Sequence, residues 1–456
     1  MQRIHFIGVS GIGVSAVAKI SIASGFIVTG SADMRNELTA SLQKEGMRFF
    51  YGHRTQNVFG ADLVVKSAAV PETNPEILEA GKRGIPVMLY AEYLGMLMEE
   101  KEGIAVAGTH GKTTTTAMLG QILFDVGLDP TVVCGGIMNR FSSNAVYGKG
   151  RYFVAEACEY NRSFLNLRKK HSVLLNIEQD HLDYYSGIED IKRAFADFME
   201  TTDPNGFAVV NGDSAYIAQV REKISSVSTI TVGYGNQNRY RIHDKVEASG
   251  RYSFSIENEG KTIVRTRLPV PGRFNCLNAA VACVCALTLG VERDKVEFAI
   301  SRFSGTKRRM EFLGKVMGSD VYTDYGHHPT EIRCTLRALK EIHPGKRLCV
   351  VFQPHQYSRT AALFDGFVNA LGEAHCIIIT DIYRQRDEKP DISMVKSDDL
   401  HAALSQKYQE KPIMLEKDYT RIPTLLCGLE KEREVIVFMG AGDIDSVARS
   451  YKACNA

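Results

Sequence analysis

Short apolar runs alternate with segments of helical periodicity over most of the chain. The apolar runs at 3–9, 104–107, 152–157, 172–177 and 348–352 have the length and continuity of strands that are buried on both faces. Strands that alternate with helices form parallel sheets with helices packed against them. The pattern therefore predicts an α/β fold, and it contains no internal repeat.

Residues 228–270 follow a different pattern. Apolar and polar positions alternate there over short segments that Gly, Asn and Asp separate, at 230–234, 240–246, 252–256 and 262–268. Such alternation is typical of half-buried antiparallel strands. We expect a small antiparallel sheet appended to the parallel one.

The longest run without a charge, 274–291, comes next. Its length alone would allow a membrane helix. Asn275 and Asn278 lie in its first turn, and Gly290 is suited to end it. We therefore expect a buried core helix.

The length of 456 residues exceeds what one core organises. We predict three domains, at 1–90, 91–300 and 301–456. The chain is 44% hydrophobic and 24% charged with a net charge of +2, which gives no reason to expect nucleic acid or a membrane as a partner. Ten cysteines occur without a C-x-x-C pair, and the N-terminus lacks the pattern of a secretory signal. These features favour a cytoplasmic protein with reduced thiols.

One stretch carries the clearest chemistry. The apolar run 104–107 breaks into Gly108-Thr109-His110-Gly111, and Lys112-Thr113 then opens a helical pattern that continues to about residue 126. Loop amides and a helix N-terminus bind phosphate, a lysine supplies positive charge, and a threonine hydroxyl can reach Mg²⁺. The loop is shorter than the usual P-loop pattern, and the alternative is an ordinary strand-to-helix turn.

Carboxylates and a histidine follow two of the predicted strands. Glu156 and Glu159 come at the end of the run 152–157, and Asp180-His181 follows the run 172–177. Carboxyl ends of parallel strands form the ligand-binding edge of an open sheet. We expect metal ligation beside a triphosphate there. The alternatives are a solvated loop charge for Glu159 and a helix cap for His181.

The N-terminus forms a strand–turn–helix–strand unit with glycines at 8, 11 and 13. A turn of this type supports a nucleotide diphosphate on a helix N-terminus, although it does not identify NAD. Asp33, beyond the second strand, is placed to accept a ribose hydroxyl. A carboxylate that caps the next helix is the equal alternative.

Two loops in the last third each end a strand and start a helix, at 324–329 and 353–359. The adjacent histidines 327 and 328 suggest zinc at first sight, but sequence neighbours rarely share one metal and no cysteine is close by, so we do not expect zinc. The turn 440–443 could hold a carboxylate, or it could be a tight turn in which Asp443 caps a helix. We assign no role to the charged loop 384–389.

Arginines of the last third could close over the γ-phosphate of ATP. Arg308, Arg309 and Arg359 are the candidates. Closure would exclude water, which protects an acyl phosphate from hydrolysis. A triphosphate site between two other α/β units indicates an enzyme that couples ATP to work between two other sites.

The chain resembles the Mur ligases over nearly its whole length. The segments that carry the resemblance are HFIGVSGIGVS (5–15), GTHGKTTTT (108–116), EACEYNRSFLNL (156–167), NIEQDHLDYY (176–185), PGRFNCLNA (271–279), GTKRRMEFLG (305–314), DYGHHPTEI (324–332), FQPHQYSRT (352–360) and MGAGDI (439–444). The 324–332 and 352–360 segments fit the alanine-adding members of the family, or the recycling relative that adds a tripeptide.

The resemblance implies a Rossmann-like N-terminal domain, a P-loop-type central ATPase domain with a small antiparallel sheet, and a Rossmann-like C-terminal domain. It implies ATP and Mg²⁺ as cofactors, and UDP-N-acetylmuramate and L-alanine as substrates. The lactyl carboxylate would attack the γ-phosphate, and the amine would then attack the acyl phosphate. We expect a monomer or a weak homodimer.

The resemblance also implies roles for particular residues. ATP would contact Gly108, Thr109, His110, Gly111, Lys112, Thr113, Thr114, Asn278, Arg308, Arg309 and Asp324. One Mg²⁺ would be held by Thr113 and Glu156, and a second would be held with the help of His181. The UDP-sugar would contact Gly8, Ser10, Gly11, Ile12, Gly13, Asp33, Ser67 and His110. The reaction itself would use Lys112, His181, Arg309, His327, His328, His355 and Arg359.

The sequence departs from the family pattern at three positions. Ser10 replaces a usual glycine, Ala32 intervenes before Asp33, and Gly326 replaces a usual alanine. Two other functional classes are considered beside the ligase. An NAD-dependent oxidoreductase leaves the 108–113 loop unexplained. A non-catalytic nucleotide-binding module would have no ligation activity for Lys112→Ala to abolish.

Overall fold

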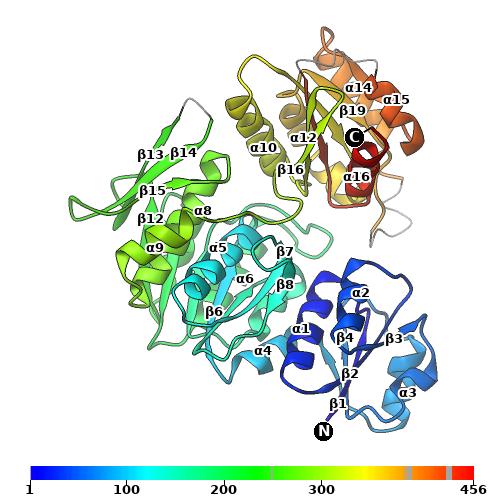
Figure 1. The fold of residues 1–456 in the computed structure, drawn as a ribbon, viewed down its shortest axis with the longest axis vertical. Helices are drawn as coiled ribbons and strands as arrows, with labels where there is room; N and C mark the ends of the chain where they lie inside the picture. The colour runs from blue at the N-terminus through cyan, green and yellow to red at the C-terminus, as the bar shows by residue number, and fades with distance from the viewer. Residues whose placement is uncertain (1, 248–249, 386, 388–392, 428–433, 456) are drawn as a thin grey trace.

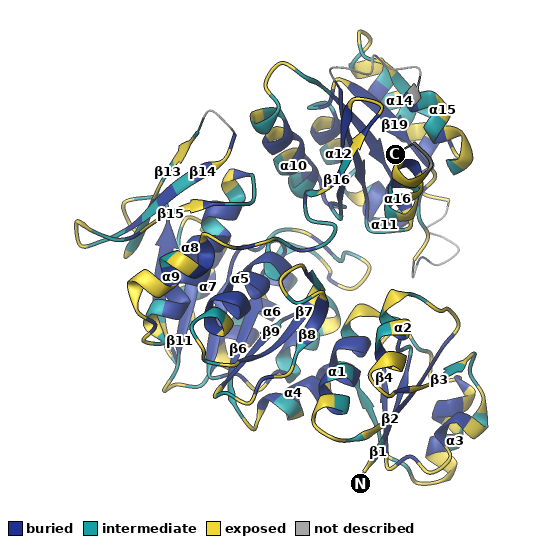
Figure 2. Cartoon of the chain, viewed as in Figure 1, coloured by how far each residue is buried: buried dark blue, intermediate teal, exposed yellow. Residues whose placement is uncertain are grey.

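The computed structural model describes residues 2–247, 250–385, 387, 393–427 and 434–455. Its strands form three separate sheets of five, ten and six strands in chain order. Figure 1 shows that the central domain adjoins both the N-terminal domain, in blue, and the C-terminal domain, in yellow to red. The central strands of each sheet are buried, whereas strands at the edges are partly exposed (Figure 2). The α/β prediction is confirmed, whereas the boundaries at residues 90 and 300 stay predictions.

The N-terminal sheet is entirely parallel, in the order β3-β2-β1-β4-β5. The strand β3 was not expected from the sequence, because its two middle residues are only half-buried. The elements are β1 (Arg3–Ile7), α1 (Ile12–Ala23), β2 (Ile27–Ala32), α2 (Glu37–Lys44), β3 (Arg48–Tyr51), η1 (Thr55–Val58), β4 (Leu63–Lys66), α3 (Pro75–Lys82), β5 (Val87–Leu89) and α4 (Tyr90–Met98).

The central sheet places β6, which precedes the phosphate loop, between β10 and β9. All three strands are parallel, so their carboxyl ends meet at one edge. The elements before the change of pattern are β6 (Glu102–Ala107), α5 (Lys112–Asp125), β7 (Thr131–Met138), β8 (Ser143–Val146), β9 (Tyr152–Glu156), η2 (Tyr160–Asn166), β10 (His171–Leu174), α6 (Ile188–Glu200), β11 (Phe207–Asn211) and α7 (Ala215–Arg221).

The expected antiparallel strands are appended to the parallel sheet, but the first of the four segments is not antiparallel. The segments β12 (Ser228–Gly233), β13 (Tyr240–Val246), β14 (Tyr252–Asn258) and β15 (Lys261–Leu268) extend the same ten-stranded sheet. Among them, β12 runs parallel to both β11 and β13, and the two pairs from β13 to β15 are antiparallel. Alternation reports which face of a strand is buried and not the direction of its neighbour, so the pattern did not separate β12 from the others.

The charge-free run forms α8 (Arg273–Thr288), which is followed by α9 (Arg293–Ile300). Most of α8 is buried, and it packs against α5 and the sheet, which confirms the core-helix prediction. Gly290 follows the helix in the left-handed conformation, with a φ of 90°. Among the described residues, no helix combines the length and the apolar character needed to cross a membrane.

The C-terminal sheet has the order β16-β17-β21-β18-β19-β20 and is parallel except for β16, which pairs antiparallel with β17. The elements are β16 (Glu311–Val316), β17 (Ser319–Asp324), α10 (Pro329–Ile342), β18 (Arg347–Phe352), α11 (Tyr357–Ala362), α12 (Phe364–Leu371), β19 (Cys376–Ile379), α14 (Ser397–Lys407), β20 (Ile413–Leu415), η3 (Tyr419–Arg421), α15 (Ile422–Cys427), β21 (Glu434–Met439) and α16 (Ile444–Asn455).

Candidate active site

The loop 108–111 is held against the end of β10 by its backbone. Asn176 accepts from the His110 amide at 2.7 Å through Oδ1, and its Nδ2 donates to the His110 carbonyl at 3.0 Å. Gly108 and Gly111 have φ values of 141° and 83°, and a Cβ on Gly111 would lie 2.6 Å from Asn278 Oδ1. No described side chain caps α5 at Gly111, so its first-turn amides suit an anion.

Lys112 lies folded over this loop. Its Nζ donates to the carbonyls of Gly108 and Thr109 at 2.6 and 3.0 Å and lies 2.9 Å from Glu159 Oε2. Burial alone would lower the pKa of Lys112, but the Glu159 carboxylate raises it, so the ammonium stays charged. The alternative of a solvated Glu159 is wrong, because the residue is only 3% exposed.

Three candidate metal ligands lie along one side of the loop. Thr113 Oγ1 donates to Glu156 Oε1 at 3.0 Å, and His181 Nε2 lies 3.8 Å from Glu159 Oε1. Burial lowers the pKa of His181, which keeps the imidazole neutral as metal ligation requires. Its Nδ1 is buried without a hydrogen-bond partner in the described part of the chain. The Thr113 hydroxyl and the Glu156 carboxylate fit one divalent cation, and the unpartnered His181 nitrogen beside Glu159 fits a second.

The helix-cap alternative for His181 is wrong. The next helix, α6, begins at Ile188 with Gly187 at its N-cap position. The His181 side chain instead faces Glu159 and Asp180, and its ring lies 5.0 Å from that of Tyr160.

Arg309 reaches this side of the loop from the C-terminal domain. Its Nη2 lies 3.5 Å from Thr113 Oγ1, and its Nη1 lies 3.6 Å from Glu331 Oε1. Asp324 holds the turn that carries it, since its carboxylate accepts from the Met310 and Gly326 amides at 2.8 and 2.7 Å. Burial raises the pKa of Asp324 to about 6.

Arg308 is oriented differently from Arg309. Its Nη2 donates to the carbonyls of Gly440 and Gly442 at 2.8 and 3.0 Å, so it organises the 440–443 turn. Asp443 accepts there from Gln353 Nε2 at 2.6 Å and from the Tyr419 hydroxyl. The structure therefore does not bring Arg308 to the phosphate loop, and its contact with ATP stays a prediction.

His110, Glu178, Thr330 and Glu331 form what we call the interdomain clasp. His110 Nδ1 lies 3.2 Å from Glu331 Oε1, and its Nε2 lies 3.5 Å from Glu178 Oε2. Thr330 Oγ1 donates to Glu178 Oε2 at 2.7 Å. Burial lowers the pKa of His110, but the two carboxylates outweigh it and raise the pKa to about 9. A charged imidazolium therefore bridges the central and C-terminal domains at neutral pH.

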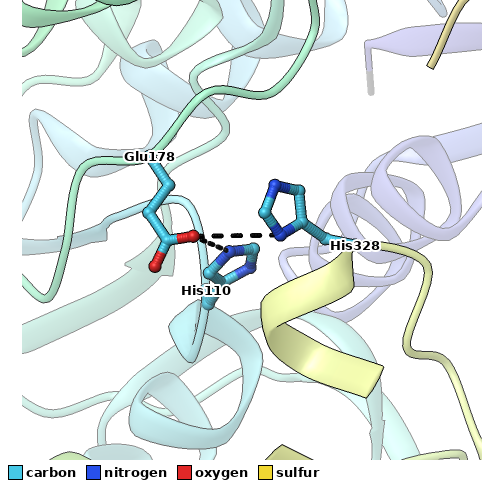
Figure 3. A group of neighbouring side chains, drawn as sticks. All are labelled: His110, Glu178 and His328. Carbon is cyan, nitrogen blue, oxygen red and sulfur yellow. Dashed lines mark ion pairs between the residues drawn. The ribbon is translucent and has the colours of Figure 1, made fainter. Parts of the chain in front are cut away.

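His110, Glu178 and His328 also have the donor set of a metal site (Figure 3), and one ligand atom from each lies within 4.8 Å of the others. Ion pairs and hydrogen bonds already link these side chains, however. The His110 nitrogens lie in ion-pair contact with Glu178 and Glu331, while His328 Nδ1 accepts from the Thr330 amide at 3.2 Å and its Nε2 donates to the Gln179 carbonyl at 3.0 Å. Ion pairs and hydrogen bonds between the domains account for the cluster without a metal. His327 faces Tyr325 and Glu331 instead, so the neighbouring histidines have different partners.

A second contact between the domains is a buried ion pair. Arg359 Nε donates to Asp180 Oδ1 at 2.9 Å, and the two side chains are 5% and 6% exposed. Burial alone would raise the pKa of the Asp180 carboxyl, but the Arg359 guanidinium holds it well below its usual range. Arg359 Nη1 also donates to His355 Nδ1 at 2.9 Å, and His355 Nε2 donates to Gln385 Oε1 at 2.7 Å. His355 is therefore fixed as the neutral Nε2–H tautomer.

Several contacts that build the site were not predicted. Asp180 was expected beside a metal and not in an ion pair with Arg359. Glu178 and Glu331 lie in the quoted segments, but a carboxylate near a helix start also fits an ordinary cap. Gln385 lies in the charged loop to which we assigned no role. Residues 386, 388 and 389 of that loop lie outside the described residues.

A cavity of about 150 Å³ lies between the central and C-terminal domains beside the clasp. Gly111, Thr114, Asn278, Arg309 and Asp324 line it, as do apolar side chains of Val270, Phe274, Phe303 and Met310. Asn278 Nδ2 donates to Asn275 Oδ1 at 3.2 Å, which orients its amide. Apolar walls with a few oriented polar groups are typical of a small-molecule site.

The N-terminal glycine turn lies at the carboxyl end of β1. The Gly8 and Val9 amides donate to the Ser31 carbonyl at 2.9 and 3.1 Å, and the Gly11 amide donates to the Gly8 carbonyl at 3.0 Å. A Cβ on Gly8 would lie 3.2 Å from Ser67 Cβ, which places Ser67 beside the turn.

The rest of the turn is fixed by its neighbours. Asn36 Nδ2 donates to the Ser10 carbonyl at 2.9 Å, and Asn144 Nδ2 donates to the Ile12 carbonyl at 2.8 Å. A Cβ on Gly13 would lie 2.9 Å from the Tyr90 ring. Ser10, which replaces a usual glycine of the family, is therefore held in the turn through its backbone carbonyl.

Asp33 does not cap the next helix, so that alternative is wrong. Asn36 caps α2, with its Oδ1 accepting from the Thr39 amide at 3.0 Å. The Asp33 side chain is 80% exposed and its Oδ2 lies 3.5 Å from His53 Nε2. Its contact with a ribose stays a prediction.

The clasp makes a testable pH prediction. A histidine whose pKa is raised by folding contributes stability that is complete below its unfolded pKa and is lost as pH rises through its folded pKa. For His110 this window runs from about 6.5 to about 9. We expect the Tm difference between the wild-type protein and His110→Gln, measured by calorimetry at several pH values, to shrink across that window. A difference that is the same at both ends would contradict the charged bridge.

Comparisons with known proteins agree with this arrangement. The description "Mur ligase family, catalytic domain" matches residues 3–102, "Mur ligase middle domain" matches 106–286, and "Mur ligase, glutamate ligase domain" matches 308–442. The UDP-N-acetylmuramate–L-alanine ligase of Aquifex aeolicus is 40% identical over 99% of this chain and 97% of its own length. That of Clostridium novyi is 39% identical over the same shares.

Solved structures show the same architecture. The crystal structure of the UDP-N-acetylmuramate–alanine ligase of Thermotoga maritima has a TM-score of 0.85 and 28% identity, covering 100% of this chain and 99% of its own. A murein peptide ligase of Psychrobacter arcticus has a TM-score of 0.74 at 22% identity, covering 99% and 98%, and shows a shared fold. The phosphate loop, the carboxylates beside it and the whole-length matches establish that this chain belongs to the Mur ligase family.

Proposed function

We propose that this protein is an ATP-dependent carboxylate–amine ligase that joins L-alanine to the lactyl carboxylate of UDP-N-acetylmuramate, in cytoplasmic peptidoglycan precursor synthesis. The observation that carries the proposal is a single polar site built from two domains. Arg309 and Glu331 of the C-terminal domain meet Thr113 and His110 of the phosphate loop there. The relatives that match nearly the whole chain are named for this reaction.

The first step brings two anions together. The lactyl carboxylate attacks the γ-phosphorus of ATP, the bond to the β–γ bridging oxygen breaks, and an acyl phosphate and ADP form. Repulsion between the carboxylate and the triphosphate opposes this encounter, and fixed positive charge reduces it. Lys112 and Arg309 supply that charge from opposite domains, and both are held by hydrogen bonds or ion pairs within the site.

The hydroxyl of Thr113 and the Glu156 carboxylate would hold one Mg²⁺, and the neutral imidazole of His181 would help to hold a second. When bound, these cations would neutralise negative charge of the triphosphate and of the incoming carboxylate. The fit rests on the donor types and on the buried, unpartnered Nδ1 of His181.

In the second step the amine of L-alanine attacks the acyl phosphate carbonyl, the amide bond forms, and phosphate leaves. The attacking amine must be neutral, so a proton acceptor is needed nearby. Burial lowers the pKa of His327 to about 3, and His355 accepts a hydrogen bond from Arg359, so both imidazoles are uncharged. The contacts of the C-terminal domain with the central domain exclude water that would hydrolyse the intermediate.

A direct assay tests the function. Phosphate release is measured with ATP, Mg²⁺ and UDP-N-acetylmuramate, with either L-alanine or a preformed tripeptide as the amine. We expect turnover with L-alanine. Turnover with the tripeptide alone would instead identify the recycling ligase, and nicotinamide-cofactor binding without ATP dependence would favour an oxidoreductase.

Glu156 provides a prediction about the metal. Replacement by Gln removes the charge but keeps the shape. Mutation of groups that only support a metal ligand already weakens metal binding about 10- to 100-fold, so loss of a carboxylate ligand should cost at least that factor. We expect the Mg²⁺ concentration for half-maximal turnover to rise by that factor. Glu102→Gln, at the opposite end of β6, should leave the Mg²⁺ requirement unchanged. An unaltered requirement in Glu156→Gln would remove Glu156 from the metal site.

A further inference from the structure

Two consecutive residues after β9 have a backbone conformation that few side chains adopt. Asn161 and Arg162 have φ values of 52° and 51° and ψ values of 30° and 24°, which is the left-handed region. Asparagine enters that region fairly readily, whereas arginine does so with strain. Such strain persists only where the surrounding structure holds the segment in place. We call residues 159–162 the strained turn and ask what holds it.

The strained turn presents two side chains to the phosphate site. Glu159 Oε2 lies 2.9 Å from Lys112 Nζ, and its Oε1 lies 3.8 Å from His181 Nε2. The Tyr160 ring lies 5.0 Å from the His181 ring. The Arg162 amide donates to the Glu159 carbonyl at 3.0 Å, which closes the turn. The conformation of the turn therefore sets the positions of both groups that face the lysine and the histidine.

The Arg162 side chain anchors the strained turn to α6. Its Nη1 donates to Asp197 Oδ2 at 2.8 Å, and its Nη2 donates to Asp190 Oδ1 at 2.9 Å. The other oxygen of Asp190 accepts from the Ser186 amide at 3.3 Å, so the same carboxylate also holds the segment that follows His181. A single exposed ion pair contributes little stability, but a guanidinium that bridges two carboxylates fixes the geometry of its own backbone.

Other contacts hold the neighbouring chain and leave this task to Arg162. Phe164 is buried, with its ring 5.3 and 4.9 Å from those of two phenylalanines on α6. It lies two residues beyond Arg162, so its packing allows the strained turn to relax. The Tyr185 hydroxyl donates to the backbone carbonyl of Glu159 and not to its side chain. The two ion pairs of Arg162 act directly on a strained residue.

We propose that Arg162 is a positioning residue for the reaction. By holding the strained turn against α6, it keeps the Glu159 carboxylate beside Lys112. It keeps the Tyr160 ring against His181 in the same way. Groups that orient metal ligands and catalytic side chains from behind contribute to activity without touching the reacting atoms. The inference deepens the proposed function and rests on it in one respect, namely that Lys112 and His181 serve ATP-dependent ligation.

Steady-state kinetics of Arg162→Ala test this role. Loss of a supporting group of this kind typically costs about 10- to 100-fold. We expect kcat for phosphate release to fall at least about tenfold, while the KM for L-alanine and the calorimetric Kd for UDP-N-acetylmuramate change less than about twofold. Arg162→Lys keeps a charge that can pair with one of the two carboxylates, so its kcat should recover to within about threefold of the wild-type value.

Hydrogen–deuterium exchange of the protein without nucleotide gives a readout apart from turnover. The Arg162 and Phe164 amides donate to the Glu159 and Cys158 carbonyls, both at 3.0 Å. The peptide that covers residues 158–166 should therefore exchange at least about fivefold faster in Arg162→Ala, because local opening exposes these amides. Peptides from β6 should be unchanged. The Arg162 side chain is 29% exposed, so the substitution leaves no buried cavity.

Arg193→Ala is the matched control, because Arg193 also pairs with Asp190, at 3.3 Å, but lies on α6 and not on the strained turn. It should keep the wild-type kcat and the wild-type exchange. The double variant Asp190→Asn, Asp197→Asn removes both charged partners of Arg162 and should reproduce the kcat of Arg162→Ala. Combining it with Arg162→Ala should cause no further loss, since all three side chains act through one contact.

The outcomes separate the two proposals. A wild-type protein that releases no phosphate with ATP, UDP-N-acetylmuramate and L-alanine would overturn the proposed function. Wild-type turnover together with an unchanged kcat in Arg162→Ala would overturn the positioning role alone. Equal losses in Arg162→Ala and Arg193→Ala would also overturn it, because they would show that the network only stabilises α6.

Discussion

Replacing Lys112 with alanine will lower kcat/KM for ATP-dependent ligation by about 10³-fold, the scale of removing one preorganised group that stabilises developing charge. Lys112 is the cation closest to the loop carbonyls, and its ammonium is held by Gly108, Thr109 and Glu159. The substitution should lower turnover with ATP and leave the affinity for the UDP substrate unchanged, because the glycine turn at residues 8–13 lies in another domain.

Phosphate release and calorimetric binding of UDP-N-acetylmuramate measure the two properties separately. Lys101→Ala is the matched control, since Lys101 precedes the opposite end of β6 and donates to Thr131 Oγ1. It should retain turnover. Ligation by Lys112→Ala at more than about a tenth of the wild-type rate would show that the loop does not activate ATP through this lysine.

Replacing Arg359 with alanine will have the second-largest effect. The substitution leaves Asp180 buried without its cation, and breaking a buried pair in this way costs about 3–5 kcal/mol. Asp180 lies on the central domain and Arg359 on α11, so the protein can relieve the cost by separating the two domains. We expect kcat to fall by about two to three orders of magnitude, consistent with that free energy.

Domain separation is measurable apart from catalysis. The radius of gyration from small-angle scattering should increase in Arg359→Ala, while the circular dichroism spectrum stays that of the folded protein. Arg337→Ala provides the control, because Arg337 pairs with Glu373 on the surface and such pairs contribute at most about 1 kcal/mol. A compact Arg359→Ala protein with wild-type turnover would show that the pair does not hold the domains together.

Sequence patterns predicted the structure correctly where a short stretch of chain determines its own conformation. The loop 108–111 needs Gly at two left-handed or crowded positions, and the apolar run before it and the helix after it are encoded in adjacent residues. The helix α8 is marked by eighteen residues without a charge, and its burial follows from the hydrophobic effect alone. The side-chain sets at 324–329 and 353–359 were correctly placed at strand-to-helix turns.

Pairing between distant segments was not encoded locally. The direction of β12 depends on how the chain returns to the sheet after α7. The alternating pattern of β12 contains no information about that path. The sequence left undecided whether Glu159 is a solvated loop charge. Its burial depends on the contact with Lys112, which lies far away in the sequence. Asp33 and Asn36 are both residue types that cap helices. The structure shows that α2 begins after Asn36, so Asn36 and not Asp33 caps it.

The sequence by itself determined an α/β fold with a phosphate loop at 108–113, because glycine spacing, apolar periodicity and a lysine at a helix start act over a few residues, and its resemblance to the Mur ligases indicated an ATP-dependent ligase. Only the tertiary structure decided which charges meet. His110 bridges Glu178 and Glu331, and Arg359 reaches Asp180, each across tens to hundreds of residues. Ion pairs and buried hydrogen bonds depend on distances of a few ångströms, and folding alone sets those distances.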